Sequence, residues 1–578
     1  MKPGNTPAAI RWQATLALLA VSCVATAGSD RMSDRAREAL ENQPLDMVEL
    51  IVTYHQRPGP SDRANVTHNG GKIRHEFKLI KGHAITVPAN AARGLENNPN
   101  IARISYDEPV SGAALQYETL DDGLYKVTGL SSRAVASLPS SVSAGLPGLE
   151  NVPYTGNGVK VAVLDTGFKR HGDVSPSHTY SLVGKSADDD YGHGNHVTAI
   201  LGGNGSKSGG LYRGVAPDAT VIAVKVLDEQ GQGLTSDVIA GLDEVLVLNQ
   251  QYWHIKVVNM SLGHPVHEAA ADDPLVQAVE AIWDSGVVVV CSAGNAGRDG
   301  YGTITSPGNS RKVITVGAVT TWGDSDATND IVSTFSSRGP TLGDHFVKPD
   351  LITHGNRVIS ANASRSFLAS NVSENLITAP GAKSAEYYQL SGTSMAAAVV
   401  SGAVALMLEK DPSLTPDTIK ARLMRSATKV DFADVFATGA GLMDIQAALA
   451  ETRTTAQAPS PRVARDEATG RLGFEETALL WGHQQWALGY LWSDGYLWSD
   501  NSVDADGYLW SDGYLWSDGY LWSDGYLWSD GYLWSDGYLW SDSYLWSDGY
   551  LWSDGYLWSD GYLWSDNGTT SDSSTLND

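Results

Sequence analysis

Four residues that together could carry out nucleophilic acyl transfer lie far apart along the chain. Asp165 ends the apolar run VKVAVLD, His193 lies in DYGHGNHV, Asn295 ends VVVVCSAGN, and Ser394 lies in LSGTSMAAAVVSG. This chemistry needs a nucleophile, a base, a group that orients the base, and donors directed at the developing oxyanion. Each residue alone has a simpler interpretation, because Asp and Asn form turns and Ser caps helices. The hypothesis therefore depends on whether the fold brings the four together.

The elements that would position these residues form an alternating pattern between Gly158 and Ala450. Continuous valine-rich runs are typical of strands buried on both faces. The expected strands are 159–165, 220–227, 256–263, 287–295 and 312–319, and the expected helices include 235–250, 273–286 and 414–428. The alternation predicts an α/β fold with a doubly wound, mostly parallel sheet.

Functional groups in such sheets gather beyond the carboxyl ends of the strands. Asp165 and Asn295 stand where strands end, and His193 and Ser394 stand where helices begin. A helix N-terminus also favours an adjacent anion, because its first N–H groups are unpaired and its dipole is positive there. The four residues are therefore predicted to meet at one edge of the sheet.

Nine short blocks in this region make the pattern specific. In chain order they are VAVLDTG, YGHGNHV, GVAPDA, VKVLDEQGQG, VVNMSLG, CSAGN, FSSRGP, KPDL and SGTSMAA. With these blocks the sequence resembles the subtilisin-like serine peptidases, or subtilases, over roughly half the chain.

The resemblance implies a role for each of the four residues. Ser394 would attack the scissile carbonyl, and His193 would take its proton and later deliver it to the leaving amine. Asp165 would hold the imidazole tautomer and stabilise the imidazolium. The side-chain amide of Asn295 and the backbone N–H of Ser394 would form the oxyanion hole.

The resemblance also implies two backbone segments that pair with an extended substrate. They are GQG, which is Gly231, Gln232 and Gly233, and SLG, which is Ser261, Leu262 and Gly263. Backbone pairing of this kind gives affinity with little demand on the substrate's sequence. His196 lies one helical turn after His193 and competes for the role of base. The resemblance assigns that role to the first histidine, so we expect His196 to be a buried structural residue.

The N-terminal quarter of the chain has the organisation of an exported precursor. Residues 1–27 carry a basic start, a short apolar run and an Ala-Thr-Ala site, which is typical of a signal peptide. Cys23 would leave with this peptide; its acylation as a lipoprotein is the alternative.

Residues 28–112 predict a small α+β unit that the resemblance interprets as a propeptide, which would act as folding aid and inhibitor. Residues 113–150 are interpreted as a linker, and the peptidase domain as 151–450. We expect the protein to be secreted or associated with the cell surface.

The charge composition limits the classes of molecule that the chain is expected to bind. The 578 residues carry a formal net charge of −26, which argues against nucleic acid and anionic membranes as partners. The expected partners are protein or peptide substrates and the chain's own propeptide. No cofactor is expected for catalysis, and no metal ligand can be assigned. Structural calcium is possible because relatives often bind it.

The C-terminal part consists of low-complexity repeats. Residues 451–488 are interpreted as a linker, 489–566 contain twelve copies of YLWSD, and 567–578 are a polar end. The repeats predict either a stacked β-solenoid or a disordered acidic tail. Their aromatic density suggests binding to itself or to a cell-surface polymer.

The most direct interpretation is a secreted, self-processing serine endopeptidase that works through an acyl-enzyme. One alternative is an inactive or weakly active attachment protein that keeps the fold and acts through the tail. Another is an acyl-transferring ligase or a peptidase for one precursor, which would use the same site. Intact Asp165, His193, Asn295 and Ser394 favour an active enzyme.

Overall fold

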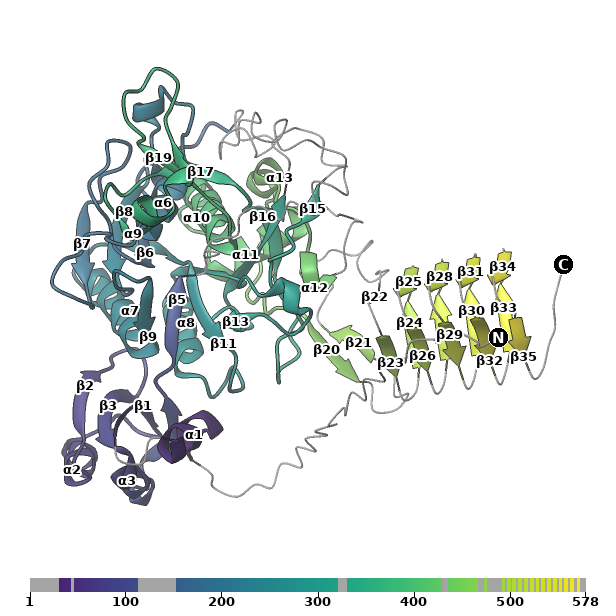
Figure 1. The fold of residues 1–578 in the computed structure, drawn as a ribbon, viewed down its shortest axis with the longest axis horizontal. Coiled ribbons are helices and arrows are strands. Elements are labelled where there is room, and N and C mark those ends of the chain that lie inside the picture. The colour runs from purple at the N-terminus through teal and green to yellow at the C-terminus, as the bar shows by residue number, and fades with distance from the viewer. Residues whose placement is uncertain are drawn as a thin grey trace, which may run out of the picture.

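The computed structural model describes residues 31–42, 46–112, 152–320, 330–428, 430 and 435–465, together with strands further along the chain. The predicted signal peptide and the whole of the predicted first linker lie outside the described residues. Figure 1 shows a small N-terminal lobe, a large central lobe and a row of C-terminal strands.

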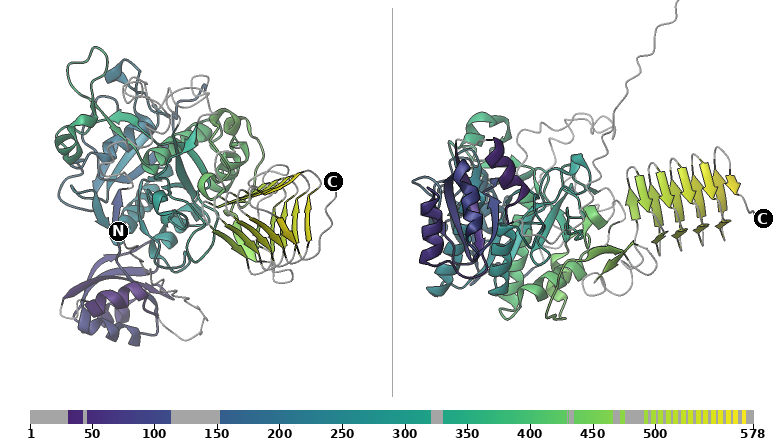
Figure 2. Two further views of the ribbon diagram at one scale, coloured as in Figure 1. Left: turned by 45° about the vertical axis from the view of Figure 1, so that its right-hand side comes forward. Right: turned by 90° about the horizontal axis from the view of Figure 1, so that it is seen from below.

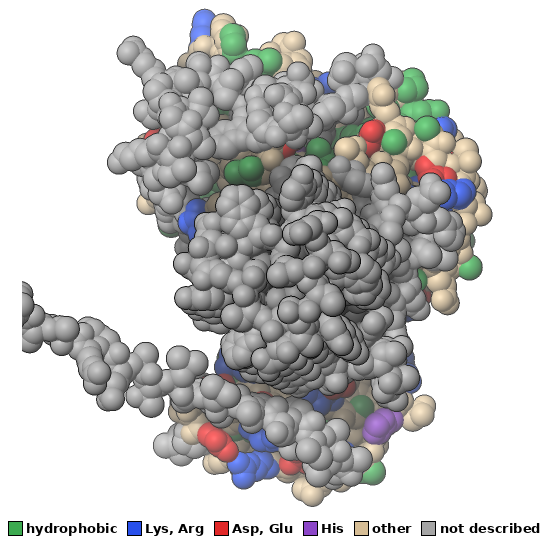
Figure 3. Space-filling view, turned by 90° about the vertical axis from the view of Figure 1, so that its right-hand side faces the viewer, with side chains coloured by type: hydrophobic (Ala, Val, Ile, Leu, Met, Phe, Trp, Pro, Cys, Tyr) green, Lys and Arg blue, Asp and Glu red, His purple; other side chains and the backbone are tan. Residues whose placement is uncertain are grey.

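The small lobe packs helices against one antiparallel sheet. Its sheet has the strand order β2-β3-β1-β4. Its elements are α1 (Asp34–Asn42), β1 (Met47–Tyr54), α2 (Pro60–His68), β2 (Lys72–Glu76), β3 (Gly82–Pro88), α3 (Ala89–Ala92) and β4 (Ile101–Tyr106). A separate core that includes Leu50, Ile85 and Ile104 lies between the helices and the sheet. This lobe therefore combines helices and strands in one small α+β unit. On the face in Figure 3, acidic and basic side chains are interspersed over the described part of this lobe.

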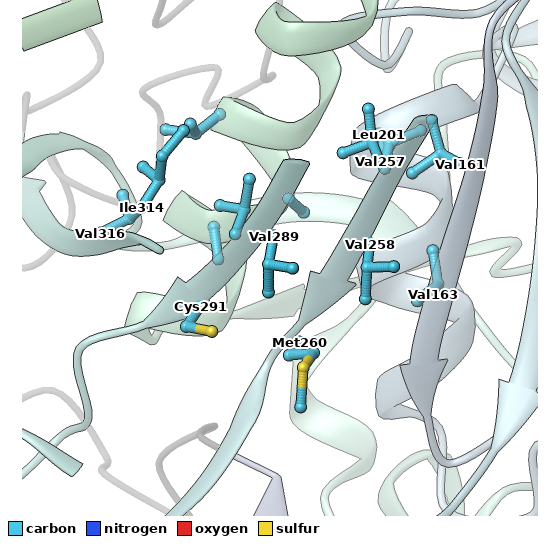
Figure 4. Close-up of a cluster of buried hydrophobic side chains, with 14 of the residues drawn as sticks. Val161, Val163, Leu201, Val257, Val258, Met260, Val289, Cys291, Ile314 and Val316 are labelled. Carbon is cyan, nitrogen blue, oxygen red and sulfur yellow. The ribbon is translucent and has the colours of Figure 1, made fainter. Parts of the chain in front are cut away.

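The central lobe contains the predicted parallel sheet. Its strand order is β15-β14-β12-β10-β6-β8-β7, and β16 also pairs with β14. The strands are β6 (Lys160–Asp165), β7 (His178–Ser181), β8 (Thr220–Lys225), β10 (Ile255–Met260), β12 (Val288–Ser292), β14 (Ile314–Thr320), β15 (Ile331–Val332) and β16 (Leu351–His354). Figure 4 shows valines of β6, β10, β12 and β14 packed side by side in the core. Their burial on both faces explains why these strands form continuous apolar runs.

Helices cover the sheet. Helix α6 contacts β6 and β8, and α10 contacts β10, β12 and β14 as well as α6, whereas α7 packs against α8. The helices are α6 (His193–Gly202), α7 (Thr235–Gln250), α8 (Pro274–Asp284), α9 (Phe367–Asn371), α10 (Thr393–Lys410), α11 (Pro416–Ser426), α12 (Val435–Thr438) and α13 (Ile445–Ala450). Among the described helices, α10 alone is long and apolar enough to span a membrane, but it is buried in this core.

Local signals set several helix ends. The Thr415 hydroxyl accepts the N–H of Thr418, and Pro416 occupies the first turn of α11. The Asp273 carboxylate caps α8 in the same way through the N–H of Leu275.

Smaller strands lie outside the main sheet. One set forms the order β13-β11-β5-β9, and another forms β17-β19-β18. They are β5 (Pro109–Gly112), β9 (Gln232–Leu234), β11 (Leu262–Pro265), β13 (Thr305–Ser306), β17 (Val358–Ala361), β18 (Leu376–Ile377) and β19 (Tyr387–Leu390). The views in Figure 2 show the small lobe against the central lobe on the side where β5 enters it.

A C-terminal strap, residues 452–463, packs onto the central lobe within the stretch interpreted as a linker. The Ser460 hydroxyl donates to Oδ1 of Asp350 at 2.6 Å and accepts from Nζ of Lys420 at 2.7 Å. Lys348 donates to Oδ2 of the same Asp350 at 2.7 Å, and all four residues are fully buried. The strap therefore completes a buried ionic cluster. It continues into β20 (Arg462–Arg465), which pairs with β21 (Leu472–Glu475).

The repeat region is described as short backbone strands from β22 (Leu491–Ser493) to β35 (Thr569–Ser571). Each strand from β22 to β32 pairs in parallel and in register with the strand three places further along, as Tyr514 pairs with Tyr532. Three stacked sheets result. The yellow strands in Figure 1 show this stacking.

Candidate active site

At the carboxyl edge of the sheet, a buried polar pair joins the first strand of the central lobe to its first helix. Asp165 ends β6 and His193 begins α6, and Nδ1 of His193 lies 2.7 Å from Oδ1 of Asp165. Both side chains are buried. Burial alone would lower the pKa of His193, but the charge and hydrogen bond of Asp165 outweigh it, so the pKa is raised. Nε2 of His193 has no hydrogen-bond partner among the described residues and is thus the nitrogen left for proton transfer.

A second buried carboxylate supports this pair. Asp189 accepts the N–H of Gly192 at 2.6 Å and the N–H of Asn195 at 2.7 Å, so it holds the N-terminal turn of α6. The Thr166 hydroxyl lies 2.8 Å from Oδ1 of Asp189 and 3.2 Å from Oδ1 of Asp165. Asp189 also contributes to the raised pKa of His193. Sequence reasoning missed Asp189, because an acidic run before a glycine is more often a solvated turn.

His196 has a different environment. Its Nε2 lies 3.1 Å from the carbonyl oxygen of Val358 and 3.0 Å from that of Tyr388. Burial is the largest cause that lowers its pKa to about 3, so the ring stays neutral and its Nε2 can donate to both carbonyls. The structure thus gives His196 a packing position and leaves the contact with Asp165 to His193.

Ser394 lies in the first turn of α10. Its Oγ donates to the carbonyl oxygen of Ser261 at 3.3 Å, and the Ser261 hydroxyl donates to the carbonyl oxygen of Ser394 at 3.0 Å. The Ser394 N–H belongs to the helical turn whose N–H groups lack intrahelical acceptors.

Asn295 lies beside the same turn. Its Oδ1 accepts the N–H of Thr393 at 3.0 Å and the Thr393 hydroxyl at 3.1 Å. Since Thr393 directly precedes Ser394, these bonds place the Asn295 amide next to the serine. Sequence reasoning did not foresee Thr393, whose hydroxyl also donates to the carbonyl oxygen of Gly294.

The two segments expected to pair with substrate flank β5, the last described strand of the small lobe. Ser111 pairs with Gln232 and Val110 with Gly233 on one side. On the other side Gly112 pairs with Leu262 and Ser111 with Gly263.

Gly231 also contacts this strand, because the N–H of Gly112 donates to its carbonyl oxygen at 3.1 Å. A Cβ placed on Gly112 would lie 3.5 Å from Nδ1 of His193. Strand β5 therefore runs between β9 and β11, in the space called the cleft below, and ends beside the histidine.

Further contacts anchor the small lobe to the surface helix α7. Asp107 accepts the N–H of Ser236 at 2.9 Å, and the carbonyl oxygen of Glu108 accepts the N–H of Thr235 at 3.0 Å. Asp243 of α7 accepts the N–H groups of Lys78 and Leu79 at 2.8 and 2.7 Å. The small lobe thus caps α7 while it delivers β5 to the cleft.

Metal binding is not indicated for the described residues, where no three or more His, Cys, Asp or Glu side chains are grouped suitably. Structural calcium stays a prediction. Cys291 is buried in β12, and burial raises the pKa of its thiol to about 12, so it is not a competing nucleophile at neutral pH.

Comparison with known proteins identifies the family. The model of the Subtilase family matches residues 156–441. Serine protease AprX of Bacillus subtilis (strain 168) is 38% identical over 300 residues, which cover 50% of this chain and 66% of AprX. The alkaline protease of Alkalihalobacillus alcalophilus is 30% identical over 433 residues, which cover 74% of this chain and 96% of that protein.

A solved structure has the same fold. Fervidolysin from Fervidobacterium pennivorans, described as a keratinolytic enzyme related to subtilisin, matches with a TM-score of 0.54 at 24% identity. The match covers 71% of this chain and 62% of fervidolysin. The family model and the relatives show, in agreement with this fold, that the chain belongs to the subtilase family of serine endopeptidases.

Proposed function

We propose that this chain is a secreted, self-processing endopeptidase that uses Ser394 as nucleophile, His193 as base and Asp165 as the group that orients the base. The observation that carries the proposal is the 2.7 Å contact between Asp165 and His193 at the point where β5 ends. A buried histidine with a raised pKa beside a bound peptide strand is suited to general acid–base catalysis.

The reaction follows from these positions. Ser394 Oγ attacks the scissile carbonyl carbon while its proton moves to Nε2 of His193, and Asp165 stabilises the resulting imidazolium. The backbone N–H of Ser394 and the Asn295 amide donate to the oxyanion. Collapse breaks the C–N bond, and the proton on His193 leaves with the amine. Water then gives a proton to His193 and attacks the ester carbonyl. Collapse breaks the C–O bond to Ser394, whose Oγ takes the proton back from His193 as the acid leaves.

The small lobe would act as the propeptide. The pairing of its strand β5 on both edges supports this role, because an extended substrate would pair in the same way. Because the lobe has its own core and caps α7, it would dock as a folded unit. It would inhibit the enzyme until the connection after Gly112 is cut and the lobe is released.

The repeats would determine location rather than chemistry. The sequence places no candidate catalytic residue after Ser394, and the repeats are rich in Tyr, Trp and Asp. We propose that the tail attaches the exported enzyme to itself or to a surface polymer. Light scattering and cell-surface retention of full-length and tail-truncated protein test this role. Equal light scattering and equal cell-surface retention of the two proteins would contradict a role of the tail in attachment.

Amide hydrolysis by purified protein tests the main proposal. Ser394→Ala should lower hydrolysis of casein and peptide anilides by about 10⁵-fold or more. The matched control is Ser413→Ala, because Ser413 is exposed and its hydroxyl bonds only to Asp411 in the described structure. Hydrolysis retained in Ser394→Ala, with contaminating protease excluded, would refute the role of the nucleophile.

A further inference from the structure

We infer that this active site takes a small residue immediately before the scissile bond, and that the side chain of Thr305 sets this preference. The inference rests on the proposed function. It concerns the face of the cleft opposite His193, and it follows from the register of β5 and the contacts of two glycines.

The register identifies which substrate residue would react. Gly112 pairs with Leu262 in an antiparallel ladder, so the next residue of an extended peptide lies opposite Ser261. The carbonyl oxygen of Ser261 is 3.3 Å from Oγ of Ser394. The reacting carbonyl therefore belongs to the residue that follows the position of Gly112.

Side-chain alternation identifies the face on which that residue's side chain lies. A Cβ at Gly112 points toward His193 and would be 3.7 Å from Cδ1 of Leu227. Successive side chains of a strand point to opposite faces, so the next side chain points away from His193, on the face shared with Ser111. Ser111 pairs with Gly263, and paired residues direct their Cβ atoms to the same face.

Thr305 fills the space on that face. A Cβ at Gly263 would lie 2.8 Å from Oγ1 of Thr305 and 3.1 Å from its Cβ. A Cβ at Gly294, the neighbour of Asn295, would lie 2.8 Å from Cγ2 of Thr305. The threonine side chain is thus wedged between the strand that binds substrate and the loop that carries the oxyanion donor.

The backbone keeps Thr305 in this position. Strand β13 pairs with β11 through Thr305 and Pro265. The Thr305 N–H donates to the carbonyl oxygen of Ala293 at 3.0 Å, and its hydroxyl donates to the same oxygen at 3.3 Å. Because both sides are tied, a large side chain cannot displace the threonine without breaking these bonds.

The chain's own sequence agrees with this restriction. The two residues after Gly112 are Ala113 and Ala114, both of which lie outside the described residues. Cleavage after the residue that follows Gly112 would place alanine before the scissile bond. The released small lobe should therefore end at Ala113, which intact mass spectrometry of the processed precursor measures.

The main test compares peptide anilides of the form Val-Ser-Gly-Xaa, which copy residues 110–112 and vary the last residue between Ala and Phe. Wild type should prefer Ala over Phe in kcat/KM by about 10-fold or more. Thr305→Gly should shift this ratio toward Phe by about 10-fold or more, and Thr305→Ala by less. Thr305→Val should keep the preference for Ala, because it keeps the volume and removes only the hydroxyl.

Thr303→Ala is the matched control, since Thr303 lies two residues away and bonds to Gly300 and Arg338 instead. It should leave the ratio unchanged. A wild-type preference for Phe, or a Thr305→Gly ratio equal to that of wild type, would overturn the inference. Wild type that hydrolyses none of the anilides and no casein would refute the proposed function instead.

Discussion

The N–H of Gly112 donates to the carbonyl oxygen of Gly231 at 3.1 Å, and this bond joins the last described strand of the small lobe to the wall of the cleft. Strand β5 also pairs with β11 on its other edge. The strand is therefore paired on both edges, with its end beside His193, and this arrangement supports the proposal that it takes the place of a substrate.

Maturation should depend on the enzyme's own nucleophile. Because β5 ends beside His193, the purified precursor should cut itself after the small lobe. The Ser394→Ala variant should then accumulate as the longer form, while Ser413→Ala matures normally. Gel analysis and N-terminal sequencing measure this. Identical processing of both variants in a protease-deficient host would show that another protease matures the chain.

Removal of the oxyanion donor should affect the transition state more than substrate binding. Asn295→Ala should lower kcat by about 10²–10³ with little change in KM, because the amide meets charge that develops only during reaction. Steady-state kinetics on one anilide separate the two constants. A large rise in KM with unchanged kcat would place Asn295 in ground-state binding.

The pH profile should reveal the role of Asp189. The pKa of His193 is raised above its ordinary value of 6.5, partly by the charge of Asp189. Hydrolysis needs neutral His193. The kcat/KM of wild type should therefore increase with pH, and the midpoint of this increase should lie above pH 6.5. Asp189→Asn removes one negative charge, which should move this midpoint to lower pH and also reduce kcat through a looser α6 turn. A reduced kcat with an unmoved midpoint would leave Asp189 with a purely structural role.

Much of this arrangement could be predicted from the sequence, for physical reasons. Buried parallel strands need apolar side chains on both faces, so β6, β8 and β12 are recognisable as valine-rich runs. Strand ends and helix starts then bring Asp165, His193 and Ser394 to one edge.

Other features depend on tertiary contacts that the sequence does not display. The run 256–263 reads as one strand, but the chain leaves the main sheet at Ser261 and forms β10 and β11. Helix α2 has a weak apolar pattern, with Val66 as its one buried aliphatic side chain. Asp189 and Thr305 act through neighbours that are distant in sequence, so no local pattern marks them.

The strap is another feature whose tertiary contacts cannot be seen in the sequence, and these contacts should affect stability. Residues 452–463 are polar and resemble a linker, yet Ser460 completes the cluster of Asp350 and Lys420. Burial lowers the pKa of Lys420 to about 7, which indicates how costly its charge is inside the protein.

Truncation after the strap should therefore leave the thermal stability unchanged, whereas truncation within the strap should lower it. A chain ending after Arg465 should keep wild-type thermal stability and peptide hydrolysis, whereas a chain ending after Thr455 should be destabilised. Ser460→Ala in the longer chain should by itself cost about 1–3 kcal/mol, because it leaves buried polar partners unsatisfied. Thermal unfolding of the three proteins in a Ser394→Ala background avoids self-digestion. Equal midpoints for all three would contradict a structural role for the strap.

Covalent labelling tests most directly the claim that Ser394 is a nucleophile activated by His193. Wild type and variants, each cut after the small lobe by the same added protease, are treated with a fluorophosphonate, and the adduct is located by peptide mass spectrometry. We predict a single adduct, on Ser394, which is lost in His193→Ala and retained in Ser413→Ala and in His196→Gln if the latter folds. Labelling at another serine, or equal labelling of Ser394 in wild type and in folded His193→Ala, would contradict the account.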